Sequence, residues 1–181
     1  MPSNAGDSQP DPDVTIPEEG WLEPALPDTR RGARQLALQA LYWESFAAGT
    51  AEEAIDKLNS RHSLSADNVE FATQLAVTVR AHSTQIDALI NSSASHWRTD
   101  RIARLDGILL RLGLAEILYF EEIPVTVSID EAVSLARQYC GEQAYAFVNG
   151  VLDAVAKNPA VANTIADDPA TTADDQETTD P

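Results

Sequence analysis

The segment RIARLDGILLRLGLAEILYF, residues 101–120, is apolar on nearly every side when it is wound as an α-helix. Asp100 is a candidate N-cap for this helix, and Pro124 lies beyond its end. A helix without a polar face must be surrounded by other elements, so the segment predicts the buried centre of the fold. Its apolar residues are Ile102, Leu105, Ile108, Leu109, Leu110, Leu112, Leu114, Ile117 and Leu118.

Four helices are expected upstream of this segment, from apolar residues repeating at helical spacing and from residues that can cap a helix. Asp28 is a candidate cap for the first helix, which we expect to run to about residue 48 and to end at Gly49. The sequence of residues 50–53 is that of a capping box and starts a second helix to about residue 60. A third helix is expected to begin after Ser65, and a fourth covers about residues 85–92.

Downstream, Ser128-Ile129-Asp130-Glu131 has the sequence of a second capping box. It predicts a helix that begins at Ser128, runs to about Tyr139 and ends at Gly141. A last helix carries apolar residues at helical spacing, which are Phe147, Val148, Val151, Leu152 and Val155. About seven helices with short connections predict an all-α fold.

Charge is distributed unevenly along the 181 residues, which hold 12 Lys and Arg against 29 Asp and Glu, a net charge of −17. Thirteen of the acids and none of the bases lie in residues 1–29 and 158–181. Such segments bury too little apolar surface to offset chain entropy, so we expect disordered acidic tails over 1–27 and 158–181 around a folded domain, 28–157. Within the first tail, Trp21 and Leu22 either dock on the core or a partner or stay loosely held.

Several classes of protein are not expected. One Cys excludes a disulfide scaffold, and with three His it leaves little for a metal site. No apolar run is long enough for a membrane span, and the N-terminus has no signal-peptide pattern, so a cytoplasmic location is expected. No phosphate-binding glycine loop is present.

Catalytic constellations are also not expected. The pairs His62-Ser63, His82-Ser83 and Ser95-His96 are adjacent in sequence, and adjacent residues on a helix point in different directions. Cys140, at a helix end, is interpreted as a small core residue rather than a reactive thiol. We therefore expect no enzyme activity, no cofactor and no metal.

The one cationic cluster is formed by Arg30, Arg31 and Arg34, in the first turns of the first expected helix. The helix dipole disfavours cations there, so a polyanionic ligand is one explanation, because guanidinium groups match phosphate oxygens. Gln39 and Tyr42 follow on the same helix and offer an amide and a ring to single-stranded RNA bases. The alternative is a solvated helix face without a ligand.

Several blocks, in order and at consistent spacing, resemble the NusB family of transcription antitermination factors. The resemblance covers about residues 30–157, and its blocks are Arg30–Arg34, Ala37–Tyr42, Asp106–Leu112, Ala115–Leu118, Ile123–Ala136 and Phe147–Asp153. It implies two small packed helical bundles. It also implies binding of boxA RNA together with the ribosomal protein NusE, in an RNA polymerase antitermination complex on ribosomal RNA operons.

Site residues follow from the same resemblance. Arg30, Arg31, Arg34, Gln39, Tyr42 and Phe147 would belong to the RNA surface, and Asp106 would face NusE. The alternative for Phe147 is core packing, and the alternative for Asp106 is an exposed acid on the central helix. Gly32 interrupts the basic run that the family often carries, and it weakens the helix start by about 1 kcal/mol relative to Ala.

Two other classes of protein compete with this interpretation. The first is a helical interaction module or homodimer with weak or no RNA binding, which Gly32 and the acidic composition favour. The second is an RNA methyltransferase that carries a NusB-like domain, which would need a further catalytic domain not present in these 181 residues.

Overall fold

The computed structural model describes residues 25–47, 49–94 and 102–158, and its described part contains seven α-helices and no strand. The expected all-α fold with about seven helices is therefore confirmed. The helices are α1 (Arg30–Glu44), α2 (Ala51–His62), α3 (Ala66–Ala81), α4 (Ser83–Ser93), α5 (Arg104–Tyr119), α6 (Val125–Tyr139) and α7 (Glu142–Ala156). Asp100, His96, Trp21, Leu22 and most of both expected tails lie outside the described residues.

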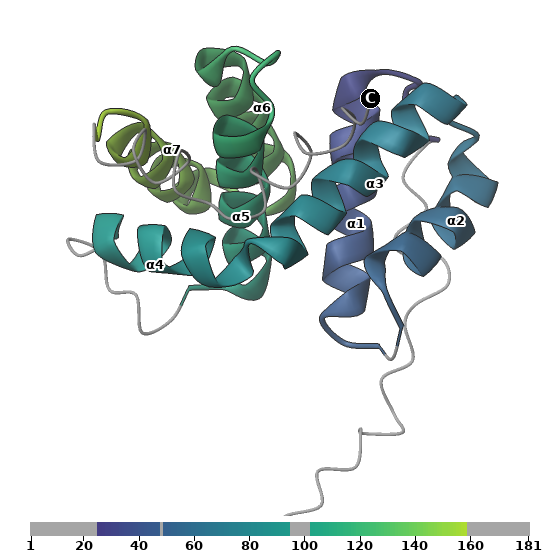
Figure 1. The fold of residues 1–181 in the computed structure, drawn as a ribbon, viewed down its shortest axis with the longest axis horizontal. Helices are drawn as coiled ribbons and strands as arrows, with labels where there is room; N and C mark the ends of the chain where they lie inside the picture. The colour runs from purple at the N-terminus through teal and green to yellow at the C-terminus, as the bar shows by residue number, and fades with distance from the viewer. Residues whose placement is uncertain (1–24, 48, 95–101, 159–181) are drawn as a thin grey trace, which may run out of the picture.

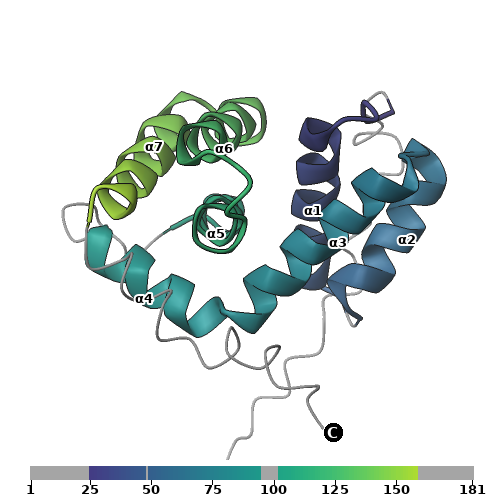
Figure 2. The same cartoon turned by 45° about the horizontal axis from the view of Figure 1, so that its top comes forward.

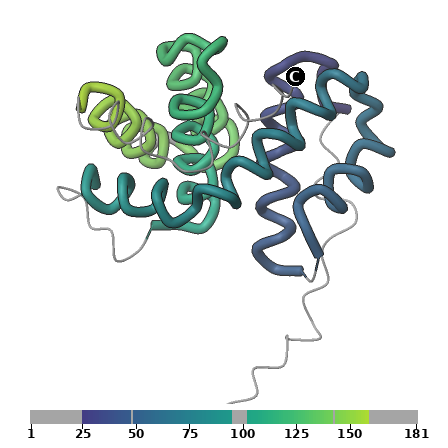
Figure 3. The backbone as a smooth tube through the Cα atoms, in the orientation of Figure 1, coloured from purple at the N-terminus to yellow at the C-terminus, as the bar shows by residue number. Residues whose placement is uncertain are grey.

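The helices form two bundles, one of α1, α2 and α3 and one of α5, α6 and α7 (Figure 1). Helix α4 follows α3 directly and packs on α5 and α7, so it leads the chain from the first bundle to the second. Figure 2 looks almost along α5 and shows α4, α6 and α7 around one side of it, with α1 and α3 beyond the other. The tube in Figure 3 follows the same path.

Helix α5 is the central helix that its apolar sequence predicts, since it packs on helices of both bundles. Leu109, Leu110 and Leu114 on this helix have no exposed surface. At Gly113 a Cβ atom would lie 2.9 Å from Leu152 Cδ1 of α7, so the absence of a side chain lets the two helices approach closely. The helix begins at Arg104 rather than Arg101, and Ile102 precedes it.

The first helix begins one residue later than a cap at Asp28 would place it. Thr29 is the N-cap, and its hydroxyl accepts a hydrogen bond from the Gly32 N–H at 3.2 Å. Asp28 instead accepts bonds from the Ser65 N–H, the Ser65 hydroxyl and the Asn68 amide at 2.7–3.0 Å, which lowers the pKa of Asp28. The carboxylate therefore joins the start of α1 to the start of α3.

Helix α1 also ends earlier than its sequence suggests, at Glu44 rather than about residue 48. The capping box of α2 is confirmed, because the Thr50 hydroxyl accepts from the Glu53 N–H and the Glu53 carboxylate accepts from the Thr50 N–H.

The expected capping box at Ser128 is wrong. Helix α6 begins at Val125, directly after Pro124, whose φ of −58° already suits a helix start. Ser128 lies inside the helix, is 1 % exposed, and donates a hydrogen bond from its hydroxyl to Glu116 Oε1 of α5 at 2.7 Å. Ser128 and Glu131 are therefore one turn apart on a helix that packs against α5.

The described chain just before α1, residues 25–29, is part of the packed structure. Leu26 is 6 % exposed, and its N–H donates to His62 Nδ1 at 3.3 Å. The chain then passes over the first turn of α1 so closely that a Cβ atom on Gly32 would lie 1.9 Å from the Pro27 carbonyl oxygen. Position 32 therefore requires glycine for a steric reason.

Candidate nucleic-acid interface

The first two turns of α1 send their three arginines in different directions. Arg34 points inward, where its side chain is 8 % exposed and makes a bidentate ion pair with Glu116 of α5. Arg34 Nε lies 2.6 Å from Glu116 Oε2, and Arg34 Nη2 lies 2.8 Å from Glu116 Oε1. Arg34, which the resemblance assigns to the RNA surface, is therefore not exposed, because Glu116, together with Ser128, holds it in a buried network between α1, α5 and α6.

Arg30 and Arg31 lie on the outside of the same turns and form the exposed pair of this interface. Arg30 donates to the Asp67 carbonyl oxygen at 2.9 Å, and its guanidinium lies 4.6 Å from the centre of the Phe71 ring. These contacts hold the guanidinium beside α3 without neutralising it, because neither partner carries a charge. Arg31 is 48 % exposed, and Arg31 Nε lies 3.8 Å from Glu131 Oε2.

Glu131 of α6 lies between the inward and the outward arginine. Its Oε2 atom is 3.8 Å from Arg31 Nε and 3.9 Å from Arg34 Nη1, so the Glu131 carboxylate attracts both guanidinium groups. The same atom is buried and has no hydrogen-bond partner in the described part of the chain. The ion pairs of Glu131 with its two arginines are therefore weaker than the ion pair of Glu116 with Arg34.

Gln39 and Tyr42 lie further along α1. Gln39 is half-buried, and its side-chain oxygen lies 3.3 Å from His62 Nε2. Tyr42 is half-buried and meets Phe46 edge to face, with ring centres 4.9 Å apart. Arg31 and Tyr42 are eleven positions apart, which corresponds to about 17 Å along the helix axis. The structure thus places these side chains along one helix but not in one cluster.

Phe147 and Asp106 are placed in the second bundle. Phe147 of α7 is half-buried and packs against the core, which agrees with the alternative given for it from the sequence. Asp106, in the first turn of α5, is half-buried and lies next to Cys140. Burial and a hydrogen bond to Asp106 raise the pKa of the Cys140 thiol to about 12, so the thiol stays protonated at neutral pH.

One exposed group was missed by the sequence analysis. Phe46, just after the end of α1, is 63 % exposed, and the Arg104 guanidinium lies 4.0 Å from the centre of its ring. Arg104 also donates to the Ser45 carbonyl oxygen at 2.6 Å. The sequence places Phe46 inside the first expected helix, so only the earlier helix end reveals it as a surface residue.

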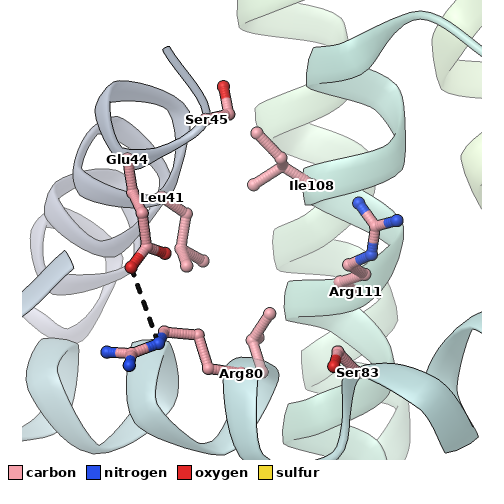
Figure 4. Close-up of a pocket in the computed structure, with 8 residues that line it drawn as sticks. Leu41, Glu44, Ser45, Arg80, Ser83, Ile108 and Arg111 are labelled. Carbon is pink, nitrogen blue, oxygen red and sulfur yellow. Dashed lines mark ion pairs between the residues drawn. The ribbon is translucent and has the colours of Figure 1, made fainter. Parts of the chain in front are cut away.

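A pocket of about 350 Å³ lies between the bundles (Figure 4). Its cations are paired with carboxylates: Arg80 with Glu44 at 3.5 Å and Glu52 at 2.6 Å, and Arg111 with Asp87 at 2.7 Å. A phosphate in this pocket would have to compete with carboxylates already in place. The start of α1 is therefore the better candidate for binding a polyanion. The pocket is lined by Leu41, Glu44, Ser45, Val79, Arg80, Ser83, Ile108 and Arg111.

The histidines of the expected helices have structural partners. His62 Nδ1 accepts from the Leu26 N–H, and burial and then Arg61 lower its pKa, which favours the neutral ring. His82 stacks on Tyr119 with ring centres 3.9 Å apart. Over the described ranges, no group of three or more His, Cys, Asp or Glu gathers as a metal site. In the same ranges, no helix is long and apolar enough to cross a bilayer.

Two helical bundles, a buried ion pair between them and an exposed arginine pair at a helix start define a small all-α binding protein. The NusB family model matches residues 31–157, and the chain belongs to that family. It is 44 % identical over 131 residues to the transcription antitermination protein NusB of Myxococcus xanthus, a match that covers 70 % of this chain and 94 % of the relative.

Solved structures agree with this family membership. The fold matches T. maritima NusB with a TM-score of 0.65 at 30 % identity, over 72 % of this chain and 92 % of that one. It also matches a chain in a crystal structure of the antitermination factors NusB and NusE in complex with dsRNA. That match has a TM-score of 0.63 at 30 % identity, over 71 % of this chain and 96 % of the other. These structures support the two-bundle arrangement that the resemblance implies.

Proposed function

We propose that this protein is a transcription antitermination factor that binds boxA-type RNA together with the ribosomal protein NusE. In this role it supports processive transcription of ribosomal RNA operons in the cytoplasm, as part of an RNA polymerase antitermination complex and without catalysing a reaction. The names of its relatives and the solved NusB–NusE–RNA assembly support the proposal. The observation that carries it is the exposed pair Arg30 and Arg31 beside a third arginine that is buried.

The proposed RNA contacts divide into two kinds. Arg30 and Arg31 would bind phosphate oxygens, since a guanidinium fork fits them and both side chains reach solvent. Gln39, Tyr42 and Phe147 are proposed to contact bases with the parts of their side chains that remain exposed. Arg34 is proposed to position the helix start rather than to touch RNA, because Glu116 holds its guanidinium.

Asp106 is proposed to belong to the NusE-facing side. It lies in the first turn of α5 and keeps part of its surface exposed while it contacts Cys140 of the α6 end. Replacing Asp106 by Asn should weaken binding of NusE and leave binding of RNA alone unchanged. Calorimetric titration of NusE into the unsubstituted chain and into D106N measures this difference.

The central test is binding of boxA RNA to the full chain, with and without NusE, at several salt concentrations. Two phosphate contacts predict that affinity falls about 7-fold between 50 and 200 mM salt, whereas three contacts predict about 18-fold. The double substitution R30A/R31A should weaken binding and remove most of this salt dependence. The control is K157A, which removes an exposed cation at the end of α7. Equal affinities for R30A/R31A and K157A would refute the proposed site.

A second candidate is a helical protein-interaction module or homodimer with little RNA binding of its own. The net charge of −17 and the buried state of Arg34 favour it, because together they leave little cationic surface at this helix start. In this case the chain would bind NusE or a second copy of itself, and boxA RNA would not increase the affinity. The same titration and the mass of the protein in solution separate the two functions.

A further inference from the structure

We infer that Glu131 competes with RNA phosphate for Arg31 and thereby sets the RNA affinity of the interface. The inference rests on the proposed function and assigns an affinity-determining role to a residue of α6, outside the basic helix. In this interface, a carboxylate of the protein and a phosphate of the RNA compete for the same guanidinium group. Removal of the Glu131 charge should therefore strengthen RNA binding.

The geometry around Glu131 shows how unequally the two carboxylates of this region are engaged. Glu116 has a bidentate ion pair with Arg34 and a hydrogen bond from Ser128. Glu131 Oε2 has no hydrogen bond in the described part of the chain, although it is buried, and its two arginines are 3.8 and 3.9 Å away. Because Arg34 is already neutralised by Glu116, Arg31 is the cation that balances Glu131.

Arg31 is placed to exchange its partner. Its side chain is 48 % exposed, and it approaches Glu131 through Nε alone at 3.8 Å, without the two short bonds of a bidentate pair. A phosphate can offer two oxygens to the same fork in good geometry. When Arg31 turns to phosphate, however, Glu131 loses its balancing cation and is left close to a second negative charge.

The expected size of the effect follows from this exchange. A carboxylate and a phosphate about 6 Å apart, near a protein surface with an effective dielectric constant between 20 and 80, repel each other enough to lower affinity by about 3- to 100-fold. Screening by salt reduces the effect, so we expect the lower part of that range at 0.15 M ionic strength. The competing view is that Glu131 holds Arg31 ready for RNA, in which case loss of its charge would weaken binding.

The test compares E131Q with D130N, measuring affinity of the full chain for boxA RNA in the presence of NusE. Asp130 is exposed and adjacent in sequence, so D130N matches the change in net charge. We expect E131Q to tighten binding at least 3-fold more than D130N does. We expect this difference to disappear when R31Q/E131Q is compared with R31Q/D130N. Thermal unfolding of each variant confirms that it is folded.

The outcomes separate the inference from the function on which it rests. Equal effects of E131Q and D130N, weaker binding by E131Q, or a difference that persists in the R31Q background would overturn the role of Glu131 and leave RNA binding intact. Failure of the unsubstituted chain to bind boxA RNA with NusE would overturn both. If E131Q were poorly folded, E131D is the substitute, because it keeps the charge but draws the carboxylate away from Arg31. E131D should bind RNA more tightly than the unsubstituted chain, and unchanged or weaker binding would overturn the inference.

Discussion

The inner and the outer side of the first turns of α1 use the same residue type for opposite purposes. On the inner side, Arg34 is 8 % exposed and lies 2.6 Å from its carboxylate, while on the outer side Arg31 is 48 % exposed and lies 3.8 Å from its own. A buried pair is costly to break because a lone charge remains in the core, whereas an exposed pair exchanges easily with water or ligand. The comparison teaches that position on the helix, and not the arginine itself, decides between structure and binding.

The largest expected effect is on the inner side. E116Q should lower the free energy of unfolding by about 3–5 kcal/mol, because it leaves the Arg34 charge buried without its main partner. R31A should change it by no more than about 1 kcal/mol. Urea denaturation measures both, with E121Q at an exposed position as the control. Similar losses for E116Q and R31A would contradict the distinction between the two sides.

The next effect concerns the chain that crosses over this helix start. Helix propensity alone predicts that G32A stabilises the protein by about 1 kcal/mol. The contact of 1.9 Å with the Pro27 carbonyl oxygen predicts the opposite, a loss of about 1–3 kcal/mol, because the crossing chain must move. Urea denaturation again decides, and a more stable G32A protein would show that the crossing is not held firmly.

A smaller loss should follow removal of the Ser128 hydroxyl. S128A takes one hydrogen-bond donor from Glu116 while Arg34 stays paired, so we expect a loss of about 1–2 kcal/mol. S134A, a change on the same helix at a half-buried position, is the comparison. A loss no greater than that of S134A would mean that Arg34 alone satisfies Glu116.

The smallest expected effect concerns His62, at the end of α2, and depends on pH. Burial lowers the pKa of His62 below its ordinary value of 6.5, so the unfolded chain takes up this proton more readily than the folded one. Stability should therefore rise with pH up to about 6.5 and fall as the pH drops below it, with loss of the bond from Leu26. Thermal unfolding from pH 5 to 8 should show this slope, and H62Q should reduce it.

Much of the fold could be predicted from the sequence because its signals are local. The apolar segment around Leu109 gave the central helix, and the capping box at Thr50 gave the start of α2. Ser128 and Glu131 have the same local pattern but serve contacts with α5 and α1, so a four-residue motif could not distinguish the two cases.

The site was less predictable, since its key contact joins residues 82 positions apart in sequence. Arg34 stands three and seven residues before Ala37 and Leu41, so helical spacing does place it on the apolar side, but only the position of Glu116 shows that a cation can be buried there. The local pattern assigns Glu131 to a capping box at Ser128, whereas α6 begins at Val125. Nothing in that pattern indicates a role beside Arg31.

The crossing of the chain over Gly32 limits how many positive side chains this helix start can display. A lysine or arginine at position 32 and the present path of Pro27 cannot coexist, whatever advantage the extra charge would bring to RNA. A chain of this fold with a basic residue there must route its N-terminal extension differently. The path of the chain at Pro27, rather than the composition of the helix, therefore sets the upper limit of the positive charge that this surface can carry.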